Sequence, residues 1–271
     1  MDFAVINSDL SYWQKQHQPL FPDLIWNIPE QKTGLLNIIG GNAQGFMASV
    51  RTAEFASKHY PFRTVTTILP DALRKSVPIS TSVEFSPSTE SGSFAKAPEL
   101  NTLFQTGDIN LVIGDLSKNS ATSIAITSAI NHATDKLYLV SRDAVDSLAN
   151  EMEHLLTLPR FFILATMPQL QKIFRAVYYP KMILLSQPLI STIETLHKFT
   201  LSYPATIITF HQEQIIVAAN GQITTTPLSE TSYSPLNLWS GQLAVHVAAL
   251  NFYNPHHNLE ASTAAILQPA T

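Results

Sequence analysis

The sequence predicts an α/β fold with one mainly parallel sheet, helices on both faces of that sheet, and an antiparallel hairpin late in the chain. Three observations support this prediction: apolar runs recur along the chain, segments of helical spacing separate them, and an Asn-Gly pair joins the last two runs. Apolar runs without alternation are typical of parallel strands that are buried on both faces. Such sheets bind ligands at the carboxyl ends of their strands, so candidate site residues are expected there.

The first unit combines a strand, a glycine turn and a helix within residues 35–60. Its apolar run LLNII is followed by Gly40, Gly41 and Gly45, and then by a segment spaced for a helix that ends near Tyr60. Glycine has no Cβ, so the backbone can turn sharply here and approach a ligand closely. Amide groups at a helix N-terminus also favour anions. The same glycines could serve only the tight turn, and the pattern alone does not decide between the two readings.

The later elements follow the same rhythm. Further strands are expected at 64–69, 110–113, 136–140, 161–165, 205–210, 214–219 and 222–226. Further helices are expected at 121–133, 143–156, 168–179, 190–201, 240–252 and 259–267. The segment 76–98 is rich in Ser, Thr and Pro and is predicted to be a surface loop. Asn220-Gly221 predicts the hairpin, because both residues tolerate a positive φ.

The chain of 271 residues is expected to form one α/β domain, 34–271, preceded by an extended lead-in, 1–33, whose aromatic side chains pack on that domain. The lead-in carries Pro19, Pro22 and Pro29, together with the aromatic residues Tyr12, Trp13, Phe21 and Trp26.

Composition narrows the classes of partner. The 16 basic and 20 acidic residues give a net charge of −4 without a Lys/Arg-rich run, which argues against nucleic acid and anionic membranes as partners. We therefore expect small-molecule ligands and a homo-oligomer. The absence of cysteine excludes disulfides, thiolate catalysis and cysteine-ligated metals. The nine histidines show no helical His-x-x-x-His pair, so no protein metal site is expected. No secretory signal or membrane-length apolar run is visible, so a cytoplasmic location is expected.

Four motifs stand where predicted strands end or helices begin. They are Gly40-Gly41-Asn42 with Gly45-Phe46, Val112-Ile113-Gly114-Asp115-Leu116, Asp143-Ala144 in the segment LYLVSRDAVDSL, and Trp239-Ser240-Gly241-Gln242. Their order and spacing over about residues 30–268 resemble the ribokinase-like superfamily, most closely its ADP- or ATP-dependent NAD(P)H-hydrate dehydratases, often labelled carbohydrate kinases. The resemblance implies a three-layer ribokinase-like fold.

The family motifs are only partly kept. Gly114 is the one glycine kept of a Gly-Pro-Gly turn, and Ser141 replaces the first acid of an Asp-Ala-Asp-Ala-Leu segment. The segment 165–170 lacks the histidine and glutamate of a Thr-Pro-His-Pro-Gly-Glu turn. Phe210-His211 stands at a lysine-glycine pair, and Gln242 stands at the aspartate of Gly-Thr-Gly-Asp.

The resemblance implies site residues. Nucleotide phosphate would bind at Ser240 and Gly241, with His211 as a further contact. The cofactor would be ADP or ATP, with Mg²⁺ entering through the nucleotide, and the substrate an NAD(P)H-like molecule. The residues implied for substrate binding are Gly41, Asn42, Gly45, Phe46 and Gly114.

The main departure from the family pattern is at the position of the catalytic aspartate. In the family, the aspartate of the late helix accepts the proton of the attacking hydroxyl, and Gln242 cannot serve as that base. Asp115 and Asp143 follow predicted strands and are the carboxylates that could substitute, although both residues could simply be capping acids.

Three functions therefore stay open. The first is a divergent NAD(P)H-hydrate dehydratase, weakly active or inactive. The second is a nucleotide-binding pseudoenzyme or interaction protein of the same fold, and the third is a kinase for a small alcohol such as a sugar or vitamin precursor. All three require that the bends near residues 42 and 241 converge on a single crevice.

Overall fold

A ten-stranded sheet with the order β1-β10-β9-β8-β7-β6-β5-β2-β3-β4 forms the centre of the molecule. The structure is a computed structural model that describes residues 10–15, 27–77 and 82–269. The strands are β1 Trp13–Lys15, β2 Leu35–Gly40, β3 Thr64–Pro70, β4 Val83–Ser86, β5 Ile109–Gly114, β6 Leu137–Ser141, β7 Phe161–Leu164, β8 Thr206–His211, β9 Gln214–Ala219 and β10 Gln222–Pro227. From β4 to β8 all neighbours are parallel, whereas β8, β9 and β10 pair antiparallel.

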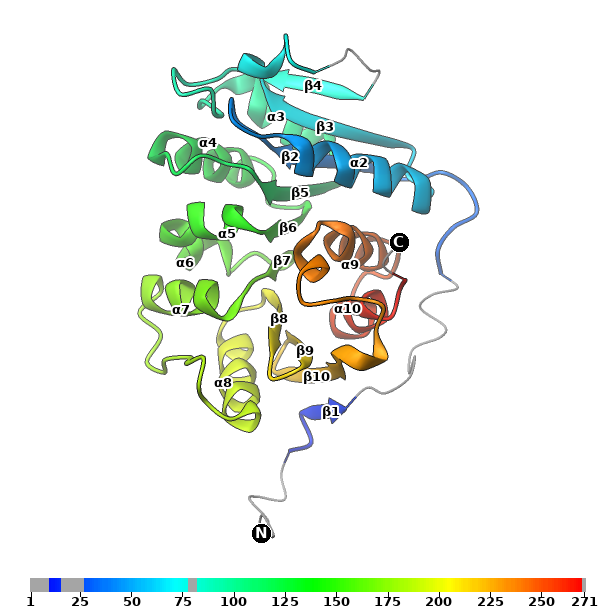
Figure 1. The fold of residues 1–271 in the computed structure, drawn as a ribbon, viewed down its shortest axis with the longest axis vertical. Helices are drawn as coiled ribbons and strands as arrows, with labels where there is room; N and C mark the ends of the chain where they lie inside the picture. Colours follow the sequence, from blue (N-terminus) through cyan, green and yellow to red (C-terminus); the bar gives the residue numbers. More distant parts are fainter. Residues whose placement is uncertain (1–9, 16–26, 78–81, 270–271) are drawn as a thin grey trace.

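Two helix layers flank the sheet (Figure 1). The described helices are α2 Met47–His59, α3 Pro98–Thr106, α4 Ser120–Asn131, α5 Asp143–Ser147, α6 Met152–Leu155, α7 Met167–Ala176, α8 Leu189–Ser202, α9 Gln242–Tyr253 and α10 Asn258–Ile266. Buried residues of α3 to α8 form one core cluster with one face of the sheet, and those of α2, α9 and α10 form the other with the opposite face. The two faces explain why strands such as β5 are buried at every position.

The predicted α/β class, the mainly parallel sheet, the two helix layers and the late hairpin are confirmed. Asn220 and Gly221 both have a positive φ at the turn between β9 and β10, as an Asn-Gly hairpin requires. None of the described helices combines the length and apolar character that crossing a membrane demands.

The prediction of a loop over 76–98 was wrong in part. Strand β4 lies inside this segment and pairs with β3 at the edge of the sheet, and Phe94 is fully buried. Val83 and Phe85 alternate along β4 and pack on a small cluster around Leu69 and Leu73. The Ser and Thr content hid this alternation. The sequence reading also missed α3, which begins at a proline and buries Leu100 and Phe104, the i and i+4 positions of one face.

The prediction of a single helix over 143–156 was also wrong. The structure divides it into α5, a 3-10 turn at Ala149–Glu151, and α6. Ser123 Oγ donates a hydrogen bond to the carbonyl of Ser147 at 2.6 Å, and the amide of Glu151 bonds to Leu148 instead. A neighbouring helix therefore takes the carbonyl that a continuous helix would need.

The described part of the lead-in adds a strand that the sequence did not predict. β1 pairs parallel to β10, and Trp13 Nε1 donates a hydrogen bond to Thr225 Oγ1 at 3.1 Å. Tyr12 stacks on His197 of α8 with ring centroids 3.7 Å apart. Pro19, Phe21, Pro22 and Trp26 of the predicted lead-in lie outside the described residues.

Candidate functional site

The carboxyl ends of β2, β5 and β6 meet at one edge of the sheet because these strands are parallel neighbours. The amide of Gly41, after β2, donates to the carbonyl of Gly114 at the end of β5, at 3.1 Å. Gly114 has φ +104, and a Cβ built there would lie 2.1 Å from Oδ1 of Asp143, after β6. Only glycine fits at this position, and its absence of a side chain lets the strand ends approach.

Asp115 is held in place from three sides. Its amide donates to Oδ1 of Asp143 at 2.8 Å, and its carbonyl accepts from Nδ2 of Asn42 at 2.5 Å. Its carboxylate pairs with Nη2 of Arg142 at 3.4 Å. Both Asp115 and Arg142 have a positive φ, of 53° and 57°, which costs an ordinary residue about 1–2 kcal/mol. Strain of this kind concentrates at functional sites.

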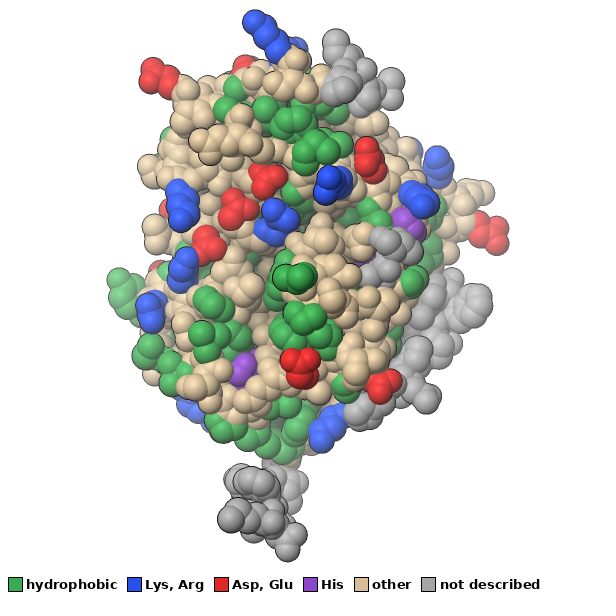
Figure 2. Space-filling model, viewed as in Figure 1, with side chains coloured by type: hydrophobic (Ala, Val, Ile, Leu, Met, Phe, Trp, Pro, Cys, Tyr) green, Lys and Arg blue, Asp and Glu red, His purple; other side chains and the backbone are tan. Residues whose placement is uncertain are grey.

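Two adjoining hollows open at this edge, and together we name them the edge crevice. They share Asp115 and Arg142. The first, of about 450 Å³, is lined by Asp115, Arg142, Asp143, Asp146, Thr166, Gln169 and Trp239. The second, of about 480 Å³, is lined by Met47, Ala48, Arg51, Thr52, Phe55, Asp115, Arg142, Ser240 and Gln242. Figure 2 shows acidic and basic side chains gathered on this face, in the region between α4 to α7 and α9.

The second hollow is suited to an anion. Arg51 and Arg142 both line it, and α9 begins there after Gly241, whose φ of 98° places it in the left-handed region. The N-terminus of a helix presents unpaired amides and a partial positive charge. Nε of Arg142 is buried and has no hydrogen-bond partner among the described residues. An anionic acceptor in the crevice would satisfy this donor, so the residues present fit a phosphate group.

The two acids of α5 differ in their ionisation. Burial raises the pKa of Asp143, against hydrogen bonds from the amides of Asp115 and Asp143 itself that lower it. Burial also opposes the charge of Asp146, but hydrogen bonds from Lys172 and Gln169 outweigh it and hold the pKa of Asp146 below its usual range. A third hollow, of about 510 Å³, shares Asp143 and Asp146 with the edge crevice and extends it toward α4.

The structure brings most of the predicted site residues together. Asp115, Asp143, Ser240 and Gln242 line the edge crevice. Asn42 bonds to Asp115, and a Cβ on Gly45 would lie 3.8 Å from Cγ of Asp115. Gly241 ends the loop before α9, where a Cβ would lie 2.3 Å from Oγ1 of Thr52. The bends near residues 42 and 241 therefore reach the same crevice.

Two predicted residues lie elsewhere. His211 is 5% exposed, its Nε2 lies 2.9 Å from the carbonyl of Gln187, and it lines neither hollow of the edge crevice. Phe46 packs against the cluster of Leu69, Leu73 and Val77. The roles predicted for His211 and Phe46 stay predictions.

Sequence reasoning missed Arg51, Arg142 and Gln169 as site residues. Arg142 directly precedes Asp143 at a strand end, so its position was available as a signal. Arg51 lies one helical turn after Met47, but a lone basic residue on a helix gives no pattern. Gln169 caps α7 by accepting hydrogen bonds from Thr166, and its Nε2 donates to Asp146 at 2.8 Å.

Solved structures identify the fold. The chain matches, over 97% of its length, a ribokinase-like superfamily protein of Enterococcus faecalis, covering 88% of that chain with a TM-score of 0.65 and 13% identity. The fold is ribokinase-like. A hypothetical protein of Streptococcus mutans matches over 89% of this chain and 82% of its own, with a TM-score of 0.58 and 15% identity. No family model and no curated protein matches the sequence.

Several of the matching structures are of proteins with a named activity. The pyridoxal kinase of Bacillus subtilis, solved as an ADP complex, matches over 86% of this chain and 89% of its own, with a TM-score of 0.50 and 12% identity. At such low identity, these matches show the fold and not the chemistry.

Proposed function

We propose that the edge crevice binds an adenine nucleotide, ADP or ATP, and that the chain is a divergent relative of the NAD(P)H-hydrate dehydratases with slow or lost turnover. The observation that supports the proposal best is the start of α9, where Ser240 and Gln242 share a hollow with Arg142. A helix N-terminus beside a guanidinium group favours phosphate. The residue at the start of that helix is an amide and not a carboxylate, so it cannot accept a proton.

The carboxylates of Asp115 and Asp143, which could replace the missing base, are already engaged in contacts within the chain. Asp115 pairs with Arg142, and Oδ1 of Asp143 accepts the amide of Asp115. A general base must have a free acceptor within reach of the proton that it removes. Both acids are engaged in holding the strand ends, which is why we favour slow or lost turnover.

The contacts that would hold a nucleotide are mainly contacts with its phosphates. The first amides of α9 and the guanidinium of Arg142 would bind its phosphates. Mg²⁺ would supply charge neutralisation through phosphate oxygens and water. The described residues contain no group of three or more His, Cys, Asp or Glu that could hold a metal alone.

A kinase for a small alcohol is the second candidate. Asp115 lines both hollows of the crevice, so its carboxylate would be the nearest candidate base for a substrate hydroxyl in either hollow. In that case the bond from Arg142 would open on substrate binding and free the carboxylate as a base. The dehydratase candidate rests instead on the order of the motifs and adds a nicotinamide dinucleotide as ligand.

Calorimetric titration with ADP and with ATP, each with and without Mg²⁺, tests the nucleotide site. We expect Arg142→Met to weaken binding by about 10- to 100-fold, because a hydrogen bond to a charged group contributes about 1.5–3 kcal/mol. Arg63→Met is the matched control, since Arg63 is exposed and precedes β3 at the opposite edge of the sheet. Equal affinity in wild type and Arg142→Met, with both proteins folded, would contradict this placement.

Turnover is tested separately with Gln242→Asp. Restoring a carboxylate at the start of α9 should raise nucleotide-dependent dehydration of hydrated NADPH by about 10²- to 10⁴-fold, the range typical of a general base. Phosphorylation of pyridoxal and of ribose under the same conditions distinguishes a kinase from a dehydratase. Unchanged turnover in a variant that still binds nucleotide would show that Gln242 does not stand at the reacting hydroxyl.

A further inference from the structure

The connection between α7 and α8 carries an unusual concentration of exposed apolar side chains. Nine large hydrophobic residues are exposed in the part of the chain that the structure describes, and five of them lie between residues 178 and 190. They are Tyr178 (89% exposed), Met182 (56%), Leu184 (46%), Leu185 (58%) and Ile190 (37%). Single exposed hydrophobic residues need no explanation, but a contiguous group marks an interaction site.

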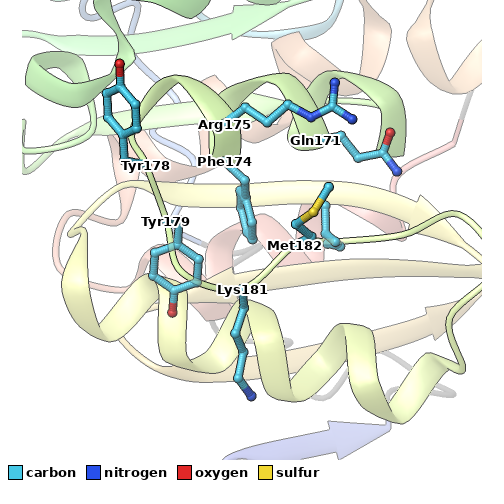
Figure 3. A pocket seen from close by; sticks show the side chains of 8 residues that line it. Gln171, Phe174, Arg175, Tyr178, Tyr179, Lys181 and Met182 are labelled. Carbon is cyan, nitrogen blue, oxygen red and sulfur yellow. The ribbon is translucent and has the colours of Figure 1, made fainter.

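A cleft lies beside this group, between α7 and the segment that follows it (Figure 3). Its lining residues are Gln171, Phe174, Arg175, Tyr178, Tyr179, Lys181, Met182 and Ile183. The ring of Phe174 stacks on Phe199 of α8 with centroids 4.3 Å apart, and Tyr179 meets Phe174 edge to face at 5.1 Å. These stacked rings fix the wall of the cleft. We name the cleft together with Leu184, Leu185 and Ile190 the docking surface.

The size of the cleft limits what enters it. Its volume is about 260 Å³. Pockets for small molecules measure about 300–1,000 Å³ and bury most of their ligand. The cleft is below that range, and the exposed Leu184, Leu185 and Ile190 are not among its lining residues. These two facts favour a protein segment that inserts one side chain and covers the surrounding surface.

The charges of the docking surface are basic. Arg175 and Lys181 line the cleft, and none of its lining residues is acidic. The ion pairs found among the described residues include neither of them. Lys181 lies close enough to Glu194 to help lower the pKa of Glu194, but the ion pair of Glu194 is with Lys198.

The same charges argue against a second copy of this chain as the occupant. A two-fold contact places the same surface of both copies face to face. Arg175 and Lys181 of one copy would then approach those of the other, and like charges across an interface are unfavourable. A partner with acidic side chains would have complementary charge instead. Tyr, Met and Arg, all present here, are enriched in such interfaces.

We infer that the docking surface binds an acidic segment of another protein, with one apolar side chain of that segment in the cleft between α7 and residues 178–183. The apolar side chain would pack against Phe174, Tyr179 and Met182, and carboxylates beside it would pair with Arg175 and Lys181. This interaction does not depend on the nucleotide site, because the cleft shares no lining residue with the edge crevice.

A peptide array tests the inference with the full chain. Its peptides carry a central Trp, Phe or Leu flanked by Glu, by Ser or by Lys, together with Glu-flanked peptides that have Ser at the centre. We expect the labelled wild-type chain to bind Glu-flanked peptides with an apolar centre. The double substitution Arg175→Glu and Lys181→Glu should reverse the preference to Lys-flanked peptides. Lys58→Glu with Arg63→Glu, at exposed positions that do not line the cleft, gives the same charge change and should leave the preference as in wild type.

Two further measurements decide the outcome. In the variant Tyr178→Asn, the new residue tolerates the φ of 50° at this position. We expect this substitution to lower the affinity for the selected peptide about tenfold. Wild-type binding that ignores peptide charge, or a preference that survives the charge reversal, would overturn the inference. So would a wild-type dimer in light scattering that Tyr178→Asn dissociates, because the occupant would then be a second copy.

Discussion

The edge crevice and the docking surface are built in opposite ways, although α7 contributes to both. The crevice gathers polar groups from strand ends and from α9, and hydrogen bonds fix Asp115 and Gln169 in it. The docking surface consists of stacked rings and exposed apolar side chains, with two cations that have no ion pair among the described residues. The fixed polar groups of the crevice suit the small charged ligand that we propose for it, and the exposed apolar side chains of the docking surface suit the protein segment that we infer.

This contrast has a physical consequence for mutation. A polar site held by strained backbone fails when one group moves, because each neighbour is positioned by the next. An apolar side chain contributes roughly in proportion to the apolar area that it buries, so its removal costs affinity without displacing its neighbours. A substitution in the crevice should therefore cause a large loss of affinity confined to that site. Substitutions in the docking surface should cause losses of affinity that grow with the apolar area removed.

Gly114→Ala is the most damaging single change that we predict. The new Cβ would lie 2.1 Å from Oδ1 of Asp143, at a φ of +104° that L residues rarely adopt. We expect a loss of about 3 kcal/mol in the free energy of unfolding, from overpacking and backbone strain together. Urea denaturation measures the loss, and calorimetry should find nucleotide binding abolished while peptide binding at the docking surface persists.

Gly45→Ala is the matched control for this change. Its Cβ would make ordinary contact with Asp115 at 3.8 Å, and its φ is not positive, so stability should change by less than about 1 kcal/mol. Equal losses in the two variants would mean that the strand ends yield to a side chain, and the contrast between a rigid crevice and a graded surface would fail.

Lowering the pH should reduce the free energy of unfolding of the whole chain, and so affect both regions together. Burial lowers the pKa of His246, on α9, to about 4, and its Nδ1 lies 2.7 Å from the hydroxyl of Tyr60. Below about pH 6.5 this histidine is protonated in the unfolded chain but stays neutral in the folded chain. The contribution of neutral His246 to the free energy of unfolding is therefore complete above pH 6.5 and is lost as the pH falls toward 4. Between pH 7 and 5 the loss should be about 2 kcal/mol.

The comparison with His246→Gln isolates this effect, because the carboxylates of both proteins titrate alike. Glutamine can keep a hydrogen bond with Tyr60 but does not titrate. Denaturation midpoints measured at pH 7 and pH 5 should fall further for wild type than for the variant. Parallel curves would show that His246 is not the group responsible.

Much of the crevice was predictable from the sequence because parallel strands end at one edge. The apolar runs before Gly40, Gly114 and Asp143 identified three strand ends. The resemblance to the ribokinase-like superfamily, and not the pattern of apolar runs, implied that Gly241 lies near them. The pairing of Arg142 with Asp115 was not predictable, since it depends on two positive φ values that neither residue type demands.

The docking surface could not be predicted for a different reason. The segment PKMILLSQP reads as apolar and therefore as buried, yet Met182 and Leu185 are exposed while Ile183 is fully buried. Exposure here is decided by how α7 and α8 pack, which a sequence pattern does not contain. Strand β4 was missed because the Ser and Thr residues around it hid the short alternation of Val83 and Phe85, which its pairing with β3 reveals.

The smallest effect that we predict tests how the two regions are joined. Thr166 caps α7 and lines the edge crevice, while Phe174 and Arg175 at the other end of α7 line the cleft of the docking surface. Thr166→Ala removes the cap and should cost about 1 kcal/mol. Thr166→Ser is the control, since serine keeps the oxygen that accepts the amide of Gln169.

Hydrogen exchange locates the effect along α7. Helix ends fray within the first turn, so exchange should rise at the amides after Thr166 and not at Phe174, whose ring is stacked on Phe199. Nucleotide affinity should then fall severalfold through Gln169, while peptide affinity at the docking surface stays as in wild type. An equal fall in both affinities would mean that α7 moves as one body and couples the crevice to the docking surface, which the rigid stacking at its far end argues against.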